Sequence, residues 1–158
     1  PLTHVTTYGI CYASGELGPK RHEGDFQVPE GFYKVSMYNP QSSYHLSMLV
    51  TYPNSSDRVF GQRGNLGGEI MIHGNCVSIG CLAMSDERVE ELWVMARSAA
   101  RPVQIHLFPT REMQALLDSG AQPEHHEFWR NLQQGHDAFE RTKVLPRFRV
   151  NRDGRYVF

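Results

Sequence analysis

The stretch Ile70–Met84, IMIHGNCVSIGCLAM, places one histidine and two of the three cysteines of the chain within fifteen positions. Alternation along a strand puts Ile70 and Ile72 on one face and His73 on the opposite face. His73 lies at the end of this strand, eight residues before Cys81. Three interpretations follow: a metal site, a disulfide, or a nucleophile with its base.

The nucleophile interpretation explains most of the stretch. A thiol of ordinary pKa is mostly protonated at neutral pH, so a catalytic cysteine needs a neighbouring base or a positive field. The loop after His73 is long enough to fold back and bring imidazole and sulfur within hydrogen-bond reach. Gly80 permits a tight turn, and the amides of Gly80 and Cys81 can bind a developing oxyanion. A helix that begins after Ser85 would direct its positive end toward this loop and favour a thiolate.

The other interpretations stay open at this point. Cysteine is among the most buried residue types, so Cys81 can also be a small core residue. A zinc site would draw its four ligands from His73, Cys76, Cys81 and either His125 or His126. Their spacing lacks the paired-ligand pattern typical of zinc. A Cys11–Cys76 disulfide would leave one thiol free and is compatible with catalysis. The acyl-transfer chemistry itself requires no metal and no organic cofactor.

Composition narrows the class of protein. The chain has 158 residues, a net charge of −1 and 21% charged residues, values typical of one globular domain over residues 1–158. Lysine and arginine are scattered without a basic stripe, which argues against a nucleic-acid or anionic membrane partner. No apolar run approaches the roughly 20 residues of a transmembrane segment. The chain opens in a strand-like stretch without a leader, so we expect a trimmed chain that has lost its targeting signal.

Periodicity predicts strands in the first two-thirds of the chain and helices later. Strand patterns cover residues 3–12, 32–37, 42–52, 69–74 and 101–108, and a hairpin is expected over residues 144–158. Residues 53–58 read as a turn. An apolar stripe predicts a helix from Ser85, formed by Val89, Leu92, Trp93 and Ala96. Two further helices are expected over residues 110–120 and 123–135. The fold class is therefore α+β, a curved, mostly antiparallel β-sheet sandwich with peripheral helices.

The motif "IHG" followed by "SIGCLAM" resembles the active-site signature of the L,D-transpeptidase catalytic-domain family, which are cell-wall enzymes of bacteria. The upstream stretch LGPKRHEGDFQVPEGFY resembles the approach to the site in that family, with Val28 where threonine is usual. The resemblance covers roughly residues 9–95 and implies an L,D-transpeptidase-like fold. It also implies that Cys81 is the nucleophile and His73 its base. The Gly74 carbonyl would orient the imidazole, and Gly80 with Cys81 would supply the oxyanion amides.

Two substitutions in the signature and a short stretch between His73 and Ser78, taken with the surrounding sequence, match one branch of the family. Ile79 stands where the signature has a second histidine, and Ala83 stands where it has arginine. The branch with these features resembles a periplasmic amidase that cleaves the diaminopimelate–lysine link between peptidoglycan and a lipoprotein. The resemblance thus implies hydrolysis through a thioester, with peptidoglycan and murein-bound lipoprotein as partners, in the periplasm.

Three other functions remain as alternatives. An L,D-transpeptidase would pass the same thioester to a second amine, forming cross-links or lipoprotein attachments. A non-catalytic peptidoglycan-binding module would keep Cys81 buried. An unrelated cysteine peptidase is disfavoured, because papain-like patterns place the cysteine well before the histidine.

Diaminopimelate carries a carboxylate and an ammonium group, so its site should offer a cation and an acceptor. Arg63, in the glycine-rich loop before the strand of His73, is the expected carboxylate ligand. The other residues expected to contact substrate are Asn75, Ser78, His45 and Tyr44. Asp25 is expected to fix its loop rather than touch substrate.

Overall fold

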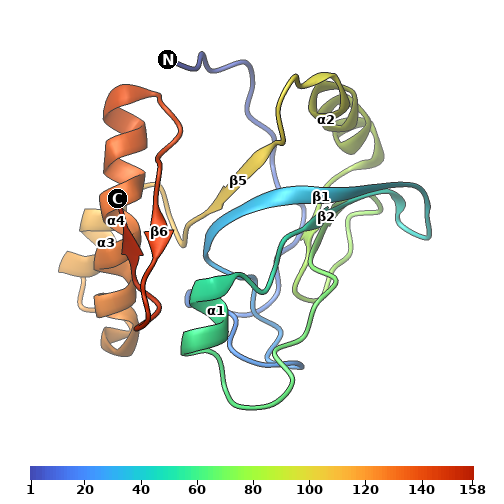
Figure 1. Ribbon diagram of the computed structural model, residues 1–158. Coiled ribbons are helices and arrows are strands. Elements are labelled where there is room, and N and C mark those ends of the chain that lie inside the picture. Colours follow the sequence, from blue (N-terminus) through green and yellow to red (C-terminus); the bar gives the residue numbers. More distant parts are fainter.

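A curved five-stranded sheet forms the centre of the structure (Figure 1). The structure is a computed structural model that describes all 158 residues. The strand order is β4-β3-β2-β1-β5. The strands are β1 (Gly31–Ser42), β2 (His45–Val50), β3 (Met71–His73), β4 (Leu82–Ala83) and β5 (Gln104–Leu107). All neighbours pair antiparallel except β3 with β4, which pair parallel. The expected α+β class, with a curved and mostly antiparallel sheet and peripheral helices, is confirmed.

One core lies between the sheet and helix α2 (Asp86–Ser98). From the sheet it receives Tyr33 and Val35 of β1 and the alternate residues Met48 and Val50 of β2. From the helix, Val89 and Ala96 are buried, while Leu92 and Trp93 pack at the edge of the core. The apolar stripe predicted for this helix is therefore the face that it buries.

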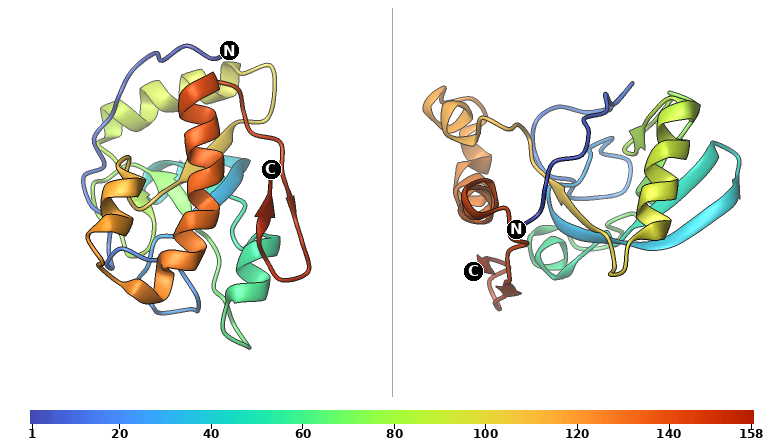
Figure 2. Two further views of the ribbon diagram at one scale, coloured as in Figure 1. Left: turned by 90° about the vertical axis from the view of Figure 1, so that its left-hand side faces the viewer. Right: turned by 90° about the horizontal axis from the view of Figure 1, so that it is seen from above.

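A second core lies at the opposite end of the molecule, around α3 (Met113–Asp118) and α4 (His126–Thr142) (Figure 2). A 3-10 turn (Pro123–His125) precedes α4, and the hairpin of β6 (Arg149–Val150) and β7 (Tyr156–Val157) packs beside it. Phe32 joins this core to the sheet, since its ring contacts Phe108, Phe148, Tyr156 and Phe158. No helix combines the length and apolarity needed to cross a bilayer.

Helix α1 (Ser55–Phe60) replaces the turn expected at residues 53–58. Its N-cap is Asn54, whose side chain accepts from the amide of Asp57, and the Asp57 carboxylate accepts from the amide of Asn54. This reciprocal capping satisfies two amides that a six-residue helix would otherwise leave free. Asp57 is itself buried and accepts a hydrogen bond from the Tyr33 hydroxyl. A long-range contact thus holds a helix too short for periodicity to reveal.

The strand expected at residues 3–12 is wrong. This segment is extended and mostly exposed, and its backbone bonds to the sheet only near its C-terminal end, where the Cys11 amide donates to the Ala83 carbonyl at 2.8 Å. Tyr12 forms an isolated bridge with Ala83. Its other end is held by a bond from the Leu2 amide to the Lys143 carbonyl. The segment has a composition that favours strands, but along most of its length no neighbouring strand is there for it to pair with.

The helix end expected at Gly135 is also wrong, because α4 continues to Thr142. A Cβ atom at Gly135 would overlap the ring of Phe158 and lie 2.6 Å from Cζ of Phe32. The glycine therefore permits close packing of aromatic rings on the helix rather than ending it.

We predict that Gly135→Ala destabilises the protein. Alanine would favour an exposed helix by about 1 kcal/mol, but overpacking against Phe32 and Phe158 should cost about 1–3 kcal/mol. Urea unfolding measures the net change. Gly68→Ala is the control, since its Cβ would meet nothing within 4 Å and it should leave stability nearly unchanged. A more stable Gly135→Ala variant would contradict the packing role.

Candidate active site

Cys81 lies where the chain turns into β4. Gly80 has a φ of +81°, a conformation that favours glycine, and it directs the chain into the parallel pairing with β3. The Sγ atom of Cys81 accepts from the Met71 amide at 3.4 Å and donates to the Glu69 carbonyl at 3.5 Å. Cys81 is the only free cysteine and is partly exposed. The start of β3 thus holds the thiol on one side.

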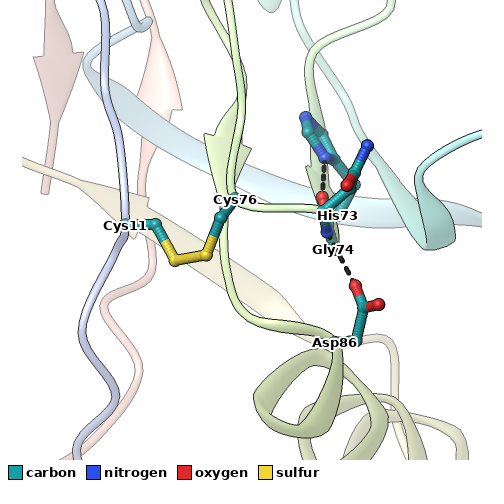
Figure 3. Close-up of a disulfide and its surroundings, with 6 residues drawn as sticks. Cys11, His73, Gly74, Cys76 and Asp86 are labelled. Atoms are coloured by element: carbon teal, nitrogen blue, oxygen red, sulfur yellow. Dashed lines mark hydrogen bonds between the residues drawn. A yellow bond between two sulfur atoms is a disulfide. The ribbon is translucent and has the colours of Figure 1, made fainter.

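His73 ends β3 and is only 3% exposed. Its Nδ1 atom lies 2.7 Å from the Gly74 carbonyl oxygen, the contact that the family resemblance implied for Gly74 (Figure 3). A carbonyl oxygen can only accept a hydrogen bond, so Nδ1 carries the proton. The lone pair is therefore on Nε2, and Nε2 is the atom through which this form of the imidazole can act as a general base.

Strand register brings the two side chains to one face of the sheet. Ile72 pairs with Leu82, so Cys81 lies beside Met71, and His73 lies two residues further along the same face. No hydrogen bond joins the thiol and the imidazole in this structure, because the thiol bonds to backbone groups of β3 and the residues before it. The strand register therefore relates the two groups, which lie two positions apart on one face of the sheet.

The β1–β2 turn covers the imidazole. The ring of Tyr44 lies against the ring of His73, with centroids 4.7 Å apart, and Tyr44 is 46% exposed. The Gly74 amide donates to the Tyr44 carbonyl at 3.0 Å, which fixes the turn against the end of β3. His45 instead turns toward α2, with its Nε2 atom 2.6 Å from the Glu90 carboxylate. Tyr44 thus borders the base, whereas His45 is engaged at the surface.

The thiol is not held as a thiolate by its surroundings. Burial raises the pKa of Cys81 above the ordinary value of a thiol, although the Met71 amide, the Ser78 hydroxyl and the charge of Lys20 lower it. The field expected from the helix after Ser85 therefore does not bring the pKa of Cys81 below its ordinary value.

A carboxylate occupies the N-terminal, positive end of the α2 dipole in this structure. The Asp86 carboxylate, in the first turn of α2, accepts from the Asn75 amide at 2.8 Å (Figure 3). Its negative charge offsets the helix dipole on the side that faces the loop of Asn75.

Both amides expected to bind an oxyanion already have acceptors. The Gly80 amide donates to the Ser14 hydroxyl at 2.6 Å, and the Cys81 amide donates to the Ser78 hydroxyl at 2.8 Å. The Ser78 hydroxyl also donates to the Cys81 carbonyl at 2.8 Å. A substrate oxygen would have to displace these two hydroxyl oxygens to reach the amides.

A disulfide between Cys11 and Cys76 ties the N-terminal segment to the loop between β3 and β4 (Figure 3). The Cys76 amide also donates to the Met84 carbonyl, on the far side of β4. The loop that carries the candidate nucleophile is therefore clamped at two points. Because Cys76 is bonded to Cys11, it is not free to be the ligand that the zinc interpretation requires.

Comparison with known proteins places the chain in a family. Residues 3–105 match the YkuD model, described as L,D-transpeptidase catalytic domain. The chain belongs to the L,D-transpeptidase catalytic-domain family. It is 39% identical over 159 aligned positions to the proteins named "Putative L,D-transpeptidase YafK" of Escherichia coli K12 and Escherichia coli O157:H7. The match covers 97% of this chain and 63% of those relatives.

Solved structures with similarity to the chain include the helical cell shape determining protein Pgp2 from Campylobacter jejuni. That match has 31% identity and a TM-score of 0.48, and covers 58% of this chain and 35% of Pgp2. Bd1075 of Bdellovibrio bacteriovorus matches with 18% identity and a TM-score of 0.42, over 78% of this chain and 45% of its own.

The two departures from the family signature have different settings. Ile79 is 72% exposed on the loop before Cys81. Ala83 is fully buried, with its backbone paired to His73 and to Tyr12. A long arginine side chain at position 83 would have to displace the residues packed around it. The small alanine side chain is therefore compatible with the backbone bridge to Tyr12 in the N-terminal segment.

The candidate substrate residues are only partly gathered around the thiol. Ser78 contacts the backbone of Cys81, and the backbone of Asn75 is bonded to α2. Arg63 lies exposed in the loop and makes no hydrogen bond or ion pair. As expected, Asp25 fixes its own loop, since it accepts from the Lys20 ammonium and from three backbone amides.

Sequence reasoning missed Lys20 and Ser14. Lys20 is 5% exposed, pairs with Asp25 at 2.7 Å, and its positive charge acts on Cys81. A lysine five residues before an aspartate carries no distinctive signal. Ser14 is brought to Gly80 by the fold of the N-terminal segment, which the sequence pattern did not reveal.

We predict that removing the disulfide lowers stability. It closes a loop of 65 residues, so the chain-entropy model gives about 4 kcal/mol for its loss. The double variant Cys11→Ser with Cys76→Ser should show this change in urea unfolding. Wild type under reducing conditions should show a similar loss. A change below about 1 kcal/mol in both would contradict the clamp.

We also predict the pH dependence of alkylation at Cys81. Because its folded pKa is raised, the thiolate fraction should increase throughout the range from pH 6 to pH 9. The rate with iodoacetamide, followed by mass spectrometry, should therefore rise about tenfold per pH unit without a plateau near neutrality. Free cysteine, with a pKa of about 8.5, is the control and should level off earlier. A plateau near pH 7 would show a standing thiolate–imidazolium pair instead.

Proposed function

We propose that the chain is a cysteine-dependent amidase that hydrolyses the diaminopimelate–lysine amide between peptidoglycan and a covalently attached lipoprotein. The observation that carries this proposal is the imidazole of His73, with Nδ1 held by the Gly74 carbonyl and Nε2 left as the base, on the strand beside the free thiol of Cys81. Family membership supports action on peptidoglycan.

The first half of the reaction forms a thioester. His73 Nε2 takes the thiol proton as the sulfur attacks the diaminopimelate carbonyl, and a carbon–sulfur bond forms. The negative oxygen replaces the hydroxyls of Ser14 and Ser78 as acceptor of the Gly80 and Cys81 amides. The carbon–nitrogen bond then breaks, and His73 returns its proton to the leaving lysine amine.

The second half decides between hydrolysis and transfer. Water attacks the thioester carbonyl while His73 takes one of its protons, and the carbon–sulfur bond breaks. His73 then passes that proton to the sulfur, which restores the thiol, and diaminopimelate departs as a free carboxylic acid that ionises in water. An amine in place of water gives the L,D-transpeptidase reaction, which is the alternative function. We favour hydrolysis because the loop before the thiol is exposed at Val77 (55%) and Ile79 (72%), which leaves water a short route to the site.

The proposed substrate also gives the proposed location. Peptidoglycan with attached lipoprotein lies in the periplasm, so we place the protein there as an exported chain. Since the chain spans 63% of the length of the curated relatives that it matches, this function is proposed for the catalytic domain.

We predict that Cys81→Ala abolishes release of lipoprotein and that His73→Ala lowers kcat/KM by about 10²–10⁴-fold, the range typical of a lost general base. Lipoprotein-bearing peptidoglycan is the substrate, and mass spectrometry identifies the products. Free lipoprotein ending in an unmodified lysine indicates the amidase, whereas new diaminopimelate cross-links indicate the transpeptidase. His4→Ala is the control, since His4 is exposed and bonds only to Thr7.

Two results would count against the proposal. Near-normal turnover by His73→Ala would remove the imidazole from its role. Binding of sacculi without any product, equal in wild type and Cys81→Ala, would instead support a non-catalytic peptidoglycan-binding module.

A further inference from the structure

A groove of about 570 Å³ lies beside the loop of Cys81, and we call it the Ile79 groove. Its volume is in the range typical of ligand sites. Its apolar walls are four side chains that are all exposed to solvent, Tyr12, Leu17, Phe26 and Ile79. Apolar side chains gathered and exposed in one hollow are typical of a binding surface.

The Ile79 groove adjoins the turn that leads into Cys81. Ile79 directly precedes Gly80, and Ser14, which also lines the groove, accepts from the Gly80 amide at 2.6 Å. Asp25 lines the groove as well and pairs with Lys20, whose charge acts on Cys81. A substrate bound with its carbonyl at the Gly80 amide would therefore extend one of its two ends into the groove.

The charge of the groove favours a cationic ligand. The carboxylates of Glu16 and Glu124 line it, and neither has an ion-pair partner. Asp25 is neutralised by Lys20. The other ionisable side chains that line it are Tyr12 and His125. Burial lowers the pKa of His125, as does the charge of Arg21, which favours the neutral imidazole. The two free carboxylates give the groove a net negative charge, which attracts cations and repels carboxylates.

The two ends of the proposed substrate differ in charge. The acyl end is diaminopimelate, whose carboxylate and ammonium group leave it without net charge, so Glu16 and Glu124 give this end little net attraction. The leaving end is a protein chain joined through a lysine. A protein segment can supply both apolar side chains for the four walls and further basic side chains for the two carboxylates.

We propose that the Ile79 groove binds the protein side of the scissile amide, as an extended segment of apolar and basic residues next to the attached lysine. This inference rests on the proposed function. The groove would then determine substrate specificity, because it would favour diaminopimelate amides linked to a protein over other diaminopimelate amides.

The experiment compares two substrates. One is lipoprotein-bearing peptidoglycan, and the other is a muropeptide whose diaminopimelate is amide-linked to a single lysine. The groove variant Glu16→Lys with Glu124→Lys should lose at least tenfold in kcat/KM on the first and less than twofold on the second. Glu87→Lys with Glu112→Lys is the control, because it makes the same charge change at exposed positions outside the groove and should leave both rates unchanged.

A direct binding measurement uses the Cys81→Ala protein and a fluorescein-labelled hexapeptide of alternating leucine and lysine. We expect the groove variant to bind it at least tenfold more weakly. Peptides with serine in place of leucine, or glutamate in place of lysine, should also bind weakly. Equal binding of all three peptides, or equal loss on both substrates, would overturn the inference.

The two proposals fail in different ways. Cleavage that persists in Cys81→Ala would refute the cysteine amidase, whatever the groove binds. Cleavage that needs Cys81 but is unchanged in the groove variant would refute only the groove.

Discussion

The pairing of β3 with β4 is the constraint on which the candidate site depends. It is the one parallel pair in an otherwise antiparallel sheet, and it joins Ile72 to Leu82. A parallel neighbour must re-enter from the same end, so the loop between the strands crosses back over the sheet. That crossing puts the end of one strand, with His73, and the start of the next, with Cys81, on one face. Strand β2, which pairs with β3, and the core under α2, which buries Ile72, keep this pair in place.

The surroundings of the Cys81 thiol favour a resting state in which the sulfur atom carries little negative charge. Burial keeps Cys81 protonated, and hydroxyl oxygens occupy both amides that would bind an oxyanion. Such a site leaves few unsatisfied polar groups before substrate arrives. The substrate carbonyl oxygen then replaces the two hydroxyl oxygens at the amides. Negative charge therefore develops on that oxygen only when the amides are there to donate to it.

Much of the site could be predicted from sequence because its residues are close together in the chain. The strand-end His-Gly, the Gly-Cys turn and the apolar stripe from Val89 to Ala96 are local patterns, and the structure has the strand, turn and helix that they predict. The same holds for the loop fixed by Asp25.

The features that sequence did not reveal depend on contacts between distant segments. The short helix α1 needs Tyr33 to pair with Asp57, and Gly135 serves the packing of Phe32 and Phe158 rather than a helix end. Ser14 meets Gly80 across 66 residues. The raised pKa of Cys81 reflects burial, which spacing along the chain does not report.

The disulfide has a consequence for maturation of the chain. Three thiols allow three different pairings, and two of them would consume the sulfur at position 81. The observed bond between Cys11 and Cys76 is the single pairing that spares it. Oxidative folding therefore has one outcome that keeps the thiol at position 81 and two that inactivate it. Once residues 11 and 76 have formed their disulfide, the third thiol has no partner within the same molecule.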